Sequence, residues 1–344
     1  MTAFARDSKK VLRILLPVAV SVALIAWLFH KVNIRQVMTI VHEGVDYRYL
    51  VAMMGLTVLS QVFRGYRWGI QLRAAGIPRL PATTECVSIF GAYALNLVFT
   101  YLGEAWRCVY ISRITGAKIS TVVGTDIGDR GSDGVMIALI SVLAFFVARP
   151  AMMHFMDKYD VGRELTAMFT DWTTWIIIAV ALLALGVLLY KMRHNIRIEK
   201  AMDSARRIWQ GFRVLFTMKG WPQYLLYTAG IWVCYFLKTY VCFWAFPFTR
   251  ELITQPGMAW GLVPGLVVFV FGSCSIAIPS NGGLGPWNIA VTFALTLYGV
   301  SQTDGATFSL VFWAFQSAML IALGVFSAIY IMVRRRRHEV GPVK

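Results

Sequence analysis

The sequence predicts an all-α polytopic membrane protein, and three observations support this class. Of the 344 residues, 58% are hydrophobic and 15% are charged, with a mean hydropathy of +0.63, whereas soluble domains are typically about 45–50% apolar. Several apolar segments reach the length of about 20 residues that a helix needs to cross a bilayer. Lysines and arginines gather at the ends of those segments. We interpret residues 1–344 as a single integral membrane domain.

About six segments qualify as full crossings by length and apolar content. They lie at about residues 11–29, 49–68, 131–149, 173–191, 222–246 and 306–333. Two further apolar stretches, at about 85–113 and 258–299, are each too long for one crossing and are interrupted in the middle. The first is broken around Thr100–Glu104, and the second at Pro279–Pro286, where glycine and proline are concentrated.

The basic residues predict which side of the membrane each loop faces, because positively charged loops stay in the cytoplasm. We assign Arg64, Arg67, Arg73 and Arg79 to the loop after the second span, and the C-terminal tail carries Arg334–Arg337. Residues 191–220 alternate basic and apolar residues at helical spacing, which is typical of a cytoplasmic amphipathic helix at the membrane surface. An ordinary solvated connector is the alternative there. The acidic loop at 151–171 suits the outside, so both termini are predicted to be cytoplasmic.

This topology makes the two interrupted stretches re-entrant helical hairpins that enter from opposite sides. A span, a hairpin and a span then occur twice, in half-repeats at 49–149 and 222–333, as an inverted repeat. Inverted repeats that meet at broken helices are how many secondary transporters build a site near the bilayer midplane. Two full crossings at 258–299 would leave the termini on the same sides, so that alternative stays open.

Ionisable residues at membrane depth are costly and usually mark a pathway or a binding site. The candidates are Glu104, Arg107, Asp126, Asp129, Arg130, Asp133 and Lys238. On a helix, Asp126 and Arg130 share a face, as do Asp129 and Asp133. We expect Asp126 and Arg130 to neutralise each other. The two remaining aspartates need Arg107, Arg130, Lys238, a proton or a cationic ligand as a partner. A structural cluster that locks the first hairpin onto the third span is the alternative.

Several features are suited to a phosphate. Arg107 lies one helical turn after Glu104, and arginine matches phosphate oxygens bidentately; Glu104 could equally serve only to anchor it. Lys238 is expected to face the bundle interior, either as a counter-ion for the aspartates or as a headgroup contact. The turn IPSNGGLGPWN offers backbone amides at the start of a helix, with a plain tight turn as the alternative. Its candidate residues are Asn281, Gly282, Gly283, Gly285 and Asn288.

Other functional classes lack support in the sequence. There is no nucleophile motif of the GxSxG type and no HExxH or Cys/His ligand spacing, so no catalytic residue, metal or cofactor is predicted. The five cysteines lie in or beside apolar segments and are interpreted as small core residues. The net charge of +16 is spread over the ends of apolar segments, so we predict anionic lipid rather than nucleic acid as the partner.

Four motifs resemble one family over nearly the whole chain. LNLVFTYLGEAWR, DIGDRGSDG, IPSNGGLGPWN and VTFALTLYGVS are similar to the membrane domain of lysylphosphatidylglycerol synthases, which also occurs as stand-alone flippase-like proteins. The resemblance implies a lipid translocator without the aminoacyltransferase domain of the full-length synthases. The chain departs from the family pattern where Thr100 and Tyr101 replace a proline and a basic residue, Trp287 and Asn288 replace a glutamate, and Gln316 replaces an arginine.

We therefore expect a flippase in the bacterial cytoplasmic (inner) membrane that moves a polar-headgroup lipid between leaflets. The expected partners are membrane lipids: an anionic or aminoacylated phospholipid, or an isoprenoid-linked lipid. One alternative is a membrane-embedded enzyme acting on phospholipid- or isoprenoid-linked substrates, with Glu104 or Asp129 as the base. Another is an accessory subunit of a lipid-modifying enzyme. The identity of the lipid and a homo-oligomeric state stay open.

Overall fold

The computed structural model describes residues 39–149 and 196–339, together with Arg35, Met153 and Ile176, and all its regular elements are helical. The longer helices are α3 (Tyr47–Ala74), α6 (Ile119–Val147), α10 (Ile196–Thr217), α11 (Trp221–Phe243) and α15 (Gln302–Glu339). The shorter ones are α4 (Ala82–Val98), α5 (Leu102–Thr115), α12 (Pro247–Thr254), α13 (Leu262–Cys274) and α14 (Pro286–Thr296), with single turns at Ile40–Gly44, Pro256–Gly261, Ser275–Ala277 and Asn281–Gly283. The predicted all-α class is confirmed. The spans predicted at 11–29 and 173–191 and the loop at 151–171 fall almost entirely outside the described residues.

Four segments of the described part are long and apolar enough to cross a membrane. They are Ile119–Val147, Trp221–Phe243, Gly257–Ala277 and Gln302–Arg334. On α6, four apolar side chains spaced three or four residues apart are each more than half exposed: Val135, Leu139, Val142 and Phe146. A continuous exposed stripe of this kind suits contact with lipid rather than with water. The chain is therefore a membrane protein built from helices.

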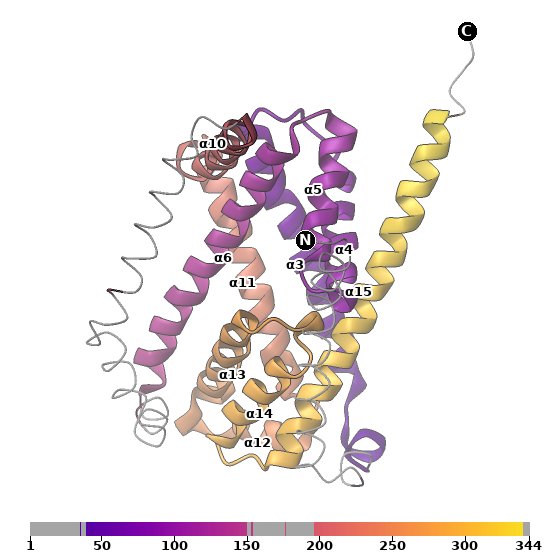
Figure 1. Cartoon of the computed structure of the whole chain (residues 1–344). Coiled ribbons are helices and arrows are strands. Elements are labelled where there is room, and N and C mark those ends of the chain that lie inside the picture. The colour runs from indigo at the N-terminus through magenta and orange to yellow at the C-terminus, as the bar shows by residue number, and fades with distance from the viewer. Residues whose placement is uncertain (1–34, 36–38, 150–152, 154–175, 177–195, 340–344) are drawn as a thin grey trace, which may run out of the picture.

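The helices pack into a bundle (Figure 1), and the two largest apolar cores of the described part lie at different places in it. One core joins α11, α12, α13, α14 and α15, where Phe246 and Phe308 pack with ring centres 5.2 Å apart. The other joins the second half of α3 to α4, α5 and the start of α6 around Trp68 and Ile111. Helix α11 packs along α3, and α15 packs along both α4 and α14. These long helices connect the two cores.

The two interrupted stretches meet at their breaks. Helices α4 and α5 pack together on either side of a break at 99–101, and α13 and α14 do so on either side of 275–285. Thr100 Oγ1 donates to Asn281 Oδ1 at 2.9 Å. A Cβ at Gly282 would lie 2.6 Å from the Leu97 side chain, so the tips touch. Both stretches are interrupted as predicted, but the first break is at 99–101 and Glu104 already lies inside α5. The re-entrant position in a membrane and the inverted repeat stay predictions.

Helix α10 crosses α6 at a pair of glycines. A Cβ at Gly124 would come within 2.3 Å of the Ile208 carbonyl oxygen and 2.9 Å of the Gly211 Cα, so glycine permits this close approach. Residues 196–217 of the predicted segment form the helix α10, whereas its position at a cytoplasmic membrane surface stays a prediction. Its exposed face includes Trp209, which is 61% exposed.

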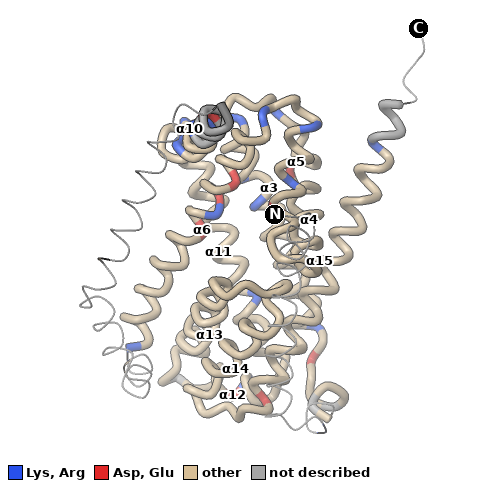
Figure 2. The backbone as a smooth tube through the Cα atoms, viewed as in Figure 1, with Lys and Arg blue, Asp and Glu red and all other residues tan. Residues whose placement is uncertain are grey.

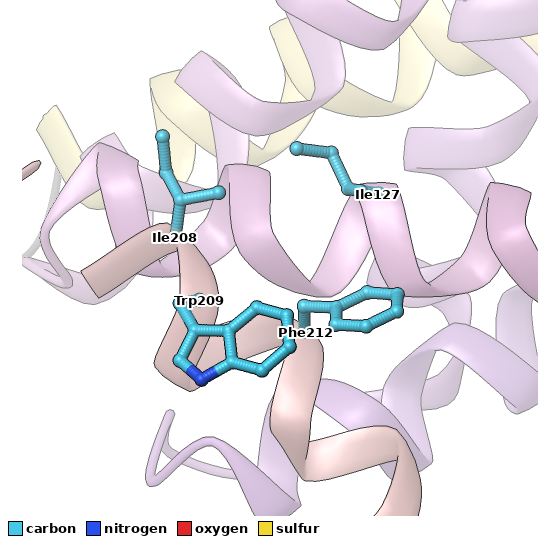
Figure 3. A pocket seen from close by; sticks show the side chains of 4 residues that line it. All are labelled: Ile127, Ile208, Trp209 and Phe212. Carbon is cyan, nitrogen blue, oxygen red and sulfur yellow. The ribbon is translucent and has the colours of Figure 1, made fainter. Parts of the chain in front are cut away.

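An apolar hollow of about 400 Å³ opens beside this crossing (Figure 3). It is lined by Ile127 of α6 and by Ile208, Trp209 and Phe212 of α10. This lining offers no charged group, so the polar chemistry of the protein lies elsewhere.

Candidate functional site

The first turn of α5 fixes Glu104 in place. Tyr101, just before the helix, has a left-handed backbone with φ of 64°. At Gly103, a Cβ would come within 1.9 Å of the Ala92 carbonyl oxygen in α4, so only glycine fits. Asn96 of α4 accepts the Gly103 N–H at 2.8 Å and donates to the Glu104 carboxylate at 3.0 Å. Helix α4 therefore supports the start of α5 and orients Glu104.

The charged residues of α6 reach across to α5. They recur every three or four positions within Asp126–Asp133 and so lie on one side of the helix. Arg107 donates to Asp126, and Arg130 donates to Glu104 at 2.5 Å. Asp126 and Arg130 do not form a direct ion pair with each other: because α5 packs against α6 here, each residue takes an oppositely charged partner on α5 instead.

Two arginines that were assigned to a cytoplasmic loop belong to the same site. Helix α3 continues to Ala74, so Arg64 and Arg67 lie within it and are 4% and 0% exposed. Arg67 lies 2.7 Å from Asp129 and 2.8 Å from Asp133, and Arg64 lies 2.8 Å from Asp133. The assignment of these two arginines to a loop is therefore wrong. They can be buried within the helix because the carboxylates of α6 compensate the charges of both guanidinium groups.

Six of these side chains are joined by ion pairs, and Arg130 and Glu104 form a separate pair on the same two helices, α6 and α5; we call all eight the charged cluster. Its members are Arg64, Arg67, Glu104, Arg107, Asp126, Asp129, Arg130 and Asp133. Figure 2 shows acidic and basic positions together where α6 passes α3 and α5. Four arginines face four carboxylates, so the charged cluster is formally neutral. Such compensation is what allows charges to persist in a bundle of apolar helices.

One edge of the charged cluster is accessible. The side chains of Arg67, Arg107 and Asp129 are 0% exposed, whereas those of Arg130 and Glu104 are 35% and 16% exposed. A molecule that approaches the charged cluster therefore meets the Arg130–Glu104 pair first. The buried pairs are suited to hold α3, α5 and α6 together.

Lys238 lies apart from the charged cluster. Its Nζ donates to Gln316 Oε1 of α15 at 2.5 Å and lies 4.6 Å from the centre of the Tyr235 ring. No acidic side chain among the described residues forms an ion pair with it. Of the two predicted roles, that of counter-ion for the aspartates is wrong, because Arg64 and Arg67 take that place. Contact with a headgroup stays a prediction.

The glycine-rich turn has the conformation that its sequence predicts. Gly282, Gly283 and Gly285 have φ of 58°, 81° and 93°, in the left-handed region that favours glycine. Asn288 is fully buried and its Oδ1 accepts the Gly285 N–H at 3.0 Å, so it caps α14. Asn281 instead lies at the contact between the two tips. That these five residues bind substrate stays a prediction.

Two tyrosines that the sequence did not single out contact the arginines. The Tyr93 hydroxyl accepts from Arg130 at 3.2 Å, and the Tyr235 hydroxyl accepts from Arg64 at 2.8 Å. Tyrosines in apolar segments are ordinarily interpreted as interface residues, so nothing local signalled these two. For Arg64 and Arg67 the sequence did carry an indication of a shared site, because two residues three positions apart lie on the same face of a helix.

The comparisons identify the family. A model described as "Lysylphosphatidylglycerol synthase TM region" matches residues 14–324, and the chain belongs to this family. The resemblance found in the sequence motifs is confirmed, and the match includes the whole charged cluster and Lys238. No curated protein and no solved structure matches the chain. The family identifies a membrane protein related to lipid modification or lipid transport.

Proposed function

We propose that this protein moves a lipid with a charged, polar headgroup between the leaflets of a membrane. The family supports a role that involves lipid, and the charged cluster supplies polar groups within an apolar bundle. Charges in such a position are costly and usually mark a pathway or a binding site.

The observation that carries the proposal is the accessible Arg130–Glu104 edge. In a cluster with a purely structural role, full burial would serve as well, as it does for Arg67 and Asp129. Arg130 donates to a single oxygen of Glu104 at 2.5 Å, and a phosphate could take that place because guanidinium groups bind phosphate bidentately. Glu104 would then keep its hydrogen bond from Asn96 while the headgroup is bound.

A transporter is favoured over the enzyme alternative. A general base needs a carboxylate that is free to take a proton from the substrate. Asp129 is fully buried between Arg67 and Arg107, at 2.7 Å and 3.5 Å, and Glu104 is held by Arg130 and Asn96. These contacts occupy both carboxylates and therefore disfavour base catalysis by either of them.

The proposed location is the bacterial cytoplasmic membrane, with both termini in the cytoplasm. Under this topology the basic helix α10 would lie at the inner leaflet, and the α4–α5 and α13–α14 pairs would enter from opposite sides. The contact between Thr100 and Asn281 supports this arrangement, because hairpins from opposite sides meet near the middle. Membrane phospholipids or isoprenoid-linked lipids are the proposed substrates.

The proposal is tested by flipping in reconstituted vesicles. Purified protein is placed in phosphatidylcholine vesicles that contain phosphatidylglycerol or phosphatidylethanolamine with a fluorescent headgroup label, and dithionite bleaches the label in the outer leaflet. Wild type should make the inner-leaflet label accessible over time. Arg130→Ala and Asp133→Asn should lose this activity, whereas Arg250→Ala, at an exposed arginine of α12, should keep it. Wild-type rates in both cluster variants would refute the proposal.

A further inference from the structure

Cations and tyrosines alternate along a line that leaves the charged cluster. The Arg130 guanidinium lies 5.5 Å from the centre of the Tyr93 ring, and the Arg64 guanidinium lies 5.3 Å from the same ring. Arg64 also lies 5.6 Å from the centre of the Tyr235 ring. Distances within about 6 Å are typical of cation–π contacts. Tyr93 thus links Arg130 to Arg64, and Arg64 leads on to Tyr235.

The line ends at Lys238. Its Nζ lies 4.6 Å from the Tyr235 ring centre and 5.9 Å from that of Phe312, and donates to Gln316. The order is Arg130, Tyr93, Arg64, Tyr235 and Lys238, and we call these five residues the cation–tyrosine ladder. They come from α6, α4, α3 and α11, so four helices contribute one feature.

We propose that the cation–tyrosine ladder carries the lipid phosphate from Arg130 to a second anion site formed by Lys238 and Gln316. The inference rests on the proposed transport of lipid, and it names the phosphate as the group that the route recognises.

The charge along the cation–tyrosine ladder favours an anion at its far end. At Arg130 a phosphate must compete with Glu104, and at Arg64 with Asp133. At Lys238 its competitor is the neutral amide of Gln316, because none of the described acidic residues pairs with that lysine. A phosphate that leaves the charged cluster therefore moves toward a cation that no carboxylate compensates.

The tyrosines supply donors along the route. Each of the hydroxyls of Tyr93 and Tyr235 accepts a hydrogen bond from an arginine, at 3.2 Å and 2.8 Å. A hydroxyl that accepts in this way still has its own proton to donate to a phosphate oxygen. Arg130, Tyr93, Tyr235 and Lys238 are partly exposed, whereas Arg64 is buried.

Lipid binding tests the second site separately from transport. Wild type and variants in detergent are titrated with dioleoylphosphatidylglycerol, and bound lipid is measured by native mass spectrometry. Lys238→Gln should weaken binding about tenfold or more, the expected loss for one charge-assisted hydrogen bond. Lys238→Arg should keep the affinity. Arg250→Gln removes an exposed positive charge of α12 and should also bind like wild type.

Two further ligands identify what is recognised. Dioleoylglycerol has the same acyl chains without the phosphate and should bind all variants equally and weakly. Inorganic phosphate should compete only weakly, since it lacks the chains that hold the lipid in the bundle. If inorganic phosphate binds as tightly as the phospholipid, the assignment to a lipid is overturned.

The outcomes separate this inference from the proposed function. If Lys238→Gln binds phosphatidylglycerol like wild type and flips it at the wild-type rate, the second anion site is overturned, even where Arg130→Ala abolishes flipping. If Arg130→Ala and Asp133→Asn flip normally, the proposed function fails, and the role of Lys238 in a route fails with it. Weaker binding together with slower flipping in Lys238→Gln supports the route.

Discussion

Replacing Arg67 with methionine should destabilise the protein more than replacing Arg67 and Asp129 together. The two side chains are 0% exposed and their charged atoms are 2.7 Å apart. At an effective dielectric constant of about 20, this separation corresponds to an attraction of about 6 kcal/mol, which desolvation partly offsets. Removing one partner of a buried pair costs about 3–5 kcal/mol, because the other charge stays buried without compensation.

The remaining arginines set the expected size of the effect. After Arg67→Met, Asp129 still has Arg107 at 3.5 Å and Arg64 at 3.8 Å, so we expect a loss near the lower end, about 3 kcal/mol. The double variant Arg67→Met/Asp129→Leu keeps the charged cluster neutral and leaves Asp133 paired with Arg64 at 2.8 Å. It should recover at least half of the lost free energy of unfolding.

Unfolding by sodium dodecyl sulfate in mixed micelles, followed by circular dichroism, measures these free energies. Phe146→Leu, at an exposed position on the lipid-facing stripe of α6, serves as the control and should behave like wild type. A double variant that is less stable than Arg67→Met alone would contradict the reasoning, because the arginine and the aspartate would then stabilise the fold independently.

Two further predictions concern the hairpin tips. Gly103→Ala should destabilise the protein by about 1–3 kcal/mol, since its Cβ would overlap a carbonyl oxygen of α4; Gly134→Ala, where nothing lies within 4 Å, should change little in the same unfolding assay. Thr100→Cys and Asn281→Cys together place two thiols at the contact between the tips, where the native Oγ1 and Oδ1 atoms are 2.9 Å apart, and they should form a disulfide on oxidation. If the tips separate during transport, the oxidised form stops flipping in vesicles and reduction restores it; equal rates in both forms would show that they stay together.

Local sequence patterns predicted much of the fold. The break in the first hairpin and the positive φ angles of the glycines in GGLG depend on residues that are close together in the sequence. Cys86, Cys108, Cys234 and Cys242 are buried with free thiols, as expected for small core residues, whereas the same expectation was wrong for Cys274, which is exposed. The charged face of α6 was likewise evident from residues spaced three and four apart.

The pairing of the charges was not predictable in the same way. Arg67 meets Asp129 and Asp133 across 62 and 66 residues of sequence, so only the packing of α3 on α6 brings them together. In the sequence, Arg64 and Arg67 look like the charged end of a membrane span. Hydropathy values include the charges of these arginines but not the carboxylates of α6 that compensate them in the folded protein. For Asp126, the nearest opposite charge in sequence was the wrong partner, since α5 supplies Arg107.

The central claim is that Arg130 serves the headgroup as well as the fold. The double variant Glu104→Gln/Arg130→Gln separates the two roles, because it keeps a neutral, hydrogen-bonding pair at this position but removes the cation. The measurement is the rate at which reconstituted protein exposes inner-leaflet labelled phosphatidylglycerol to dithionite, with folding checked by thermal stability. We predict a variant that is as stable as wild type and does not flip the lipid. A stable variant that flips at the wild-type rate would contradict the claim.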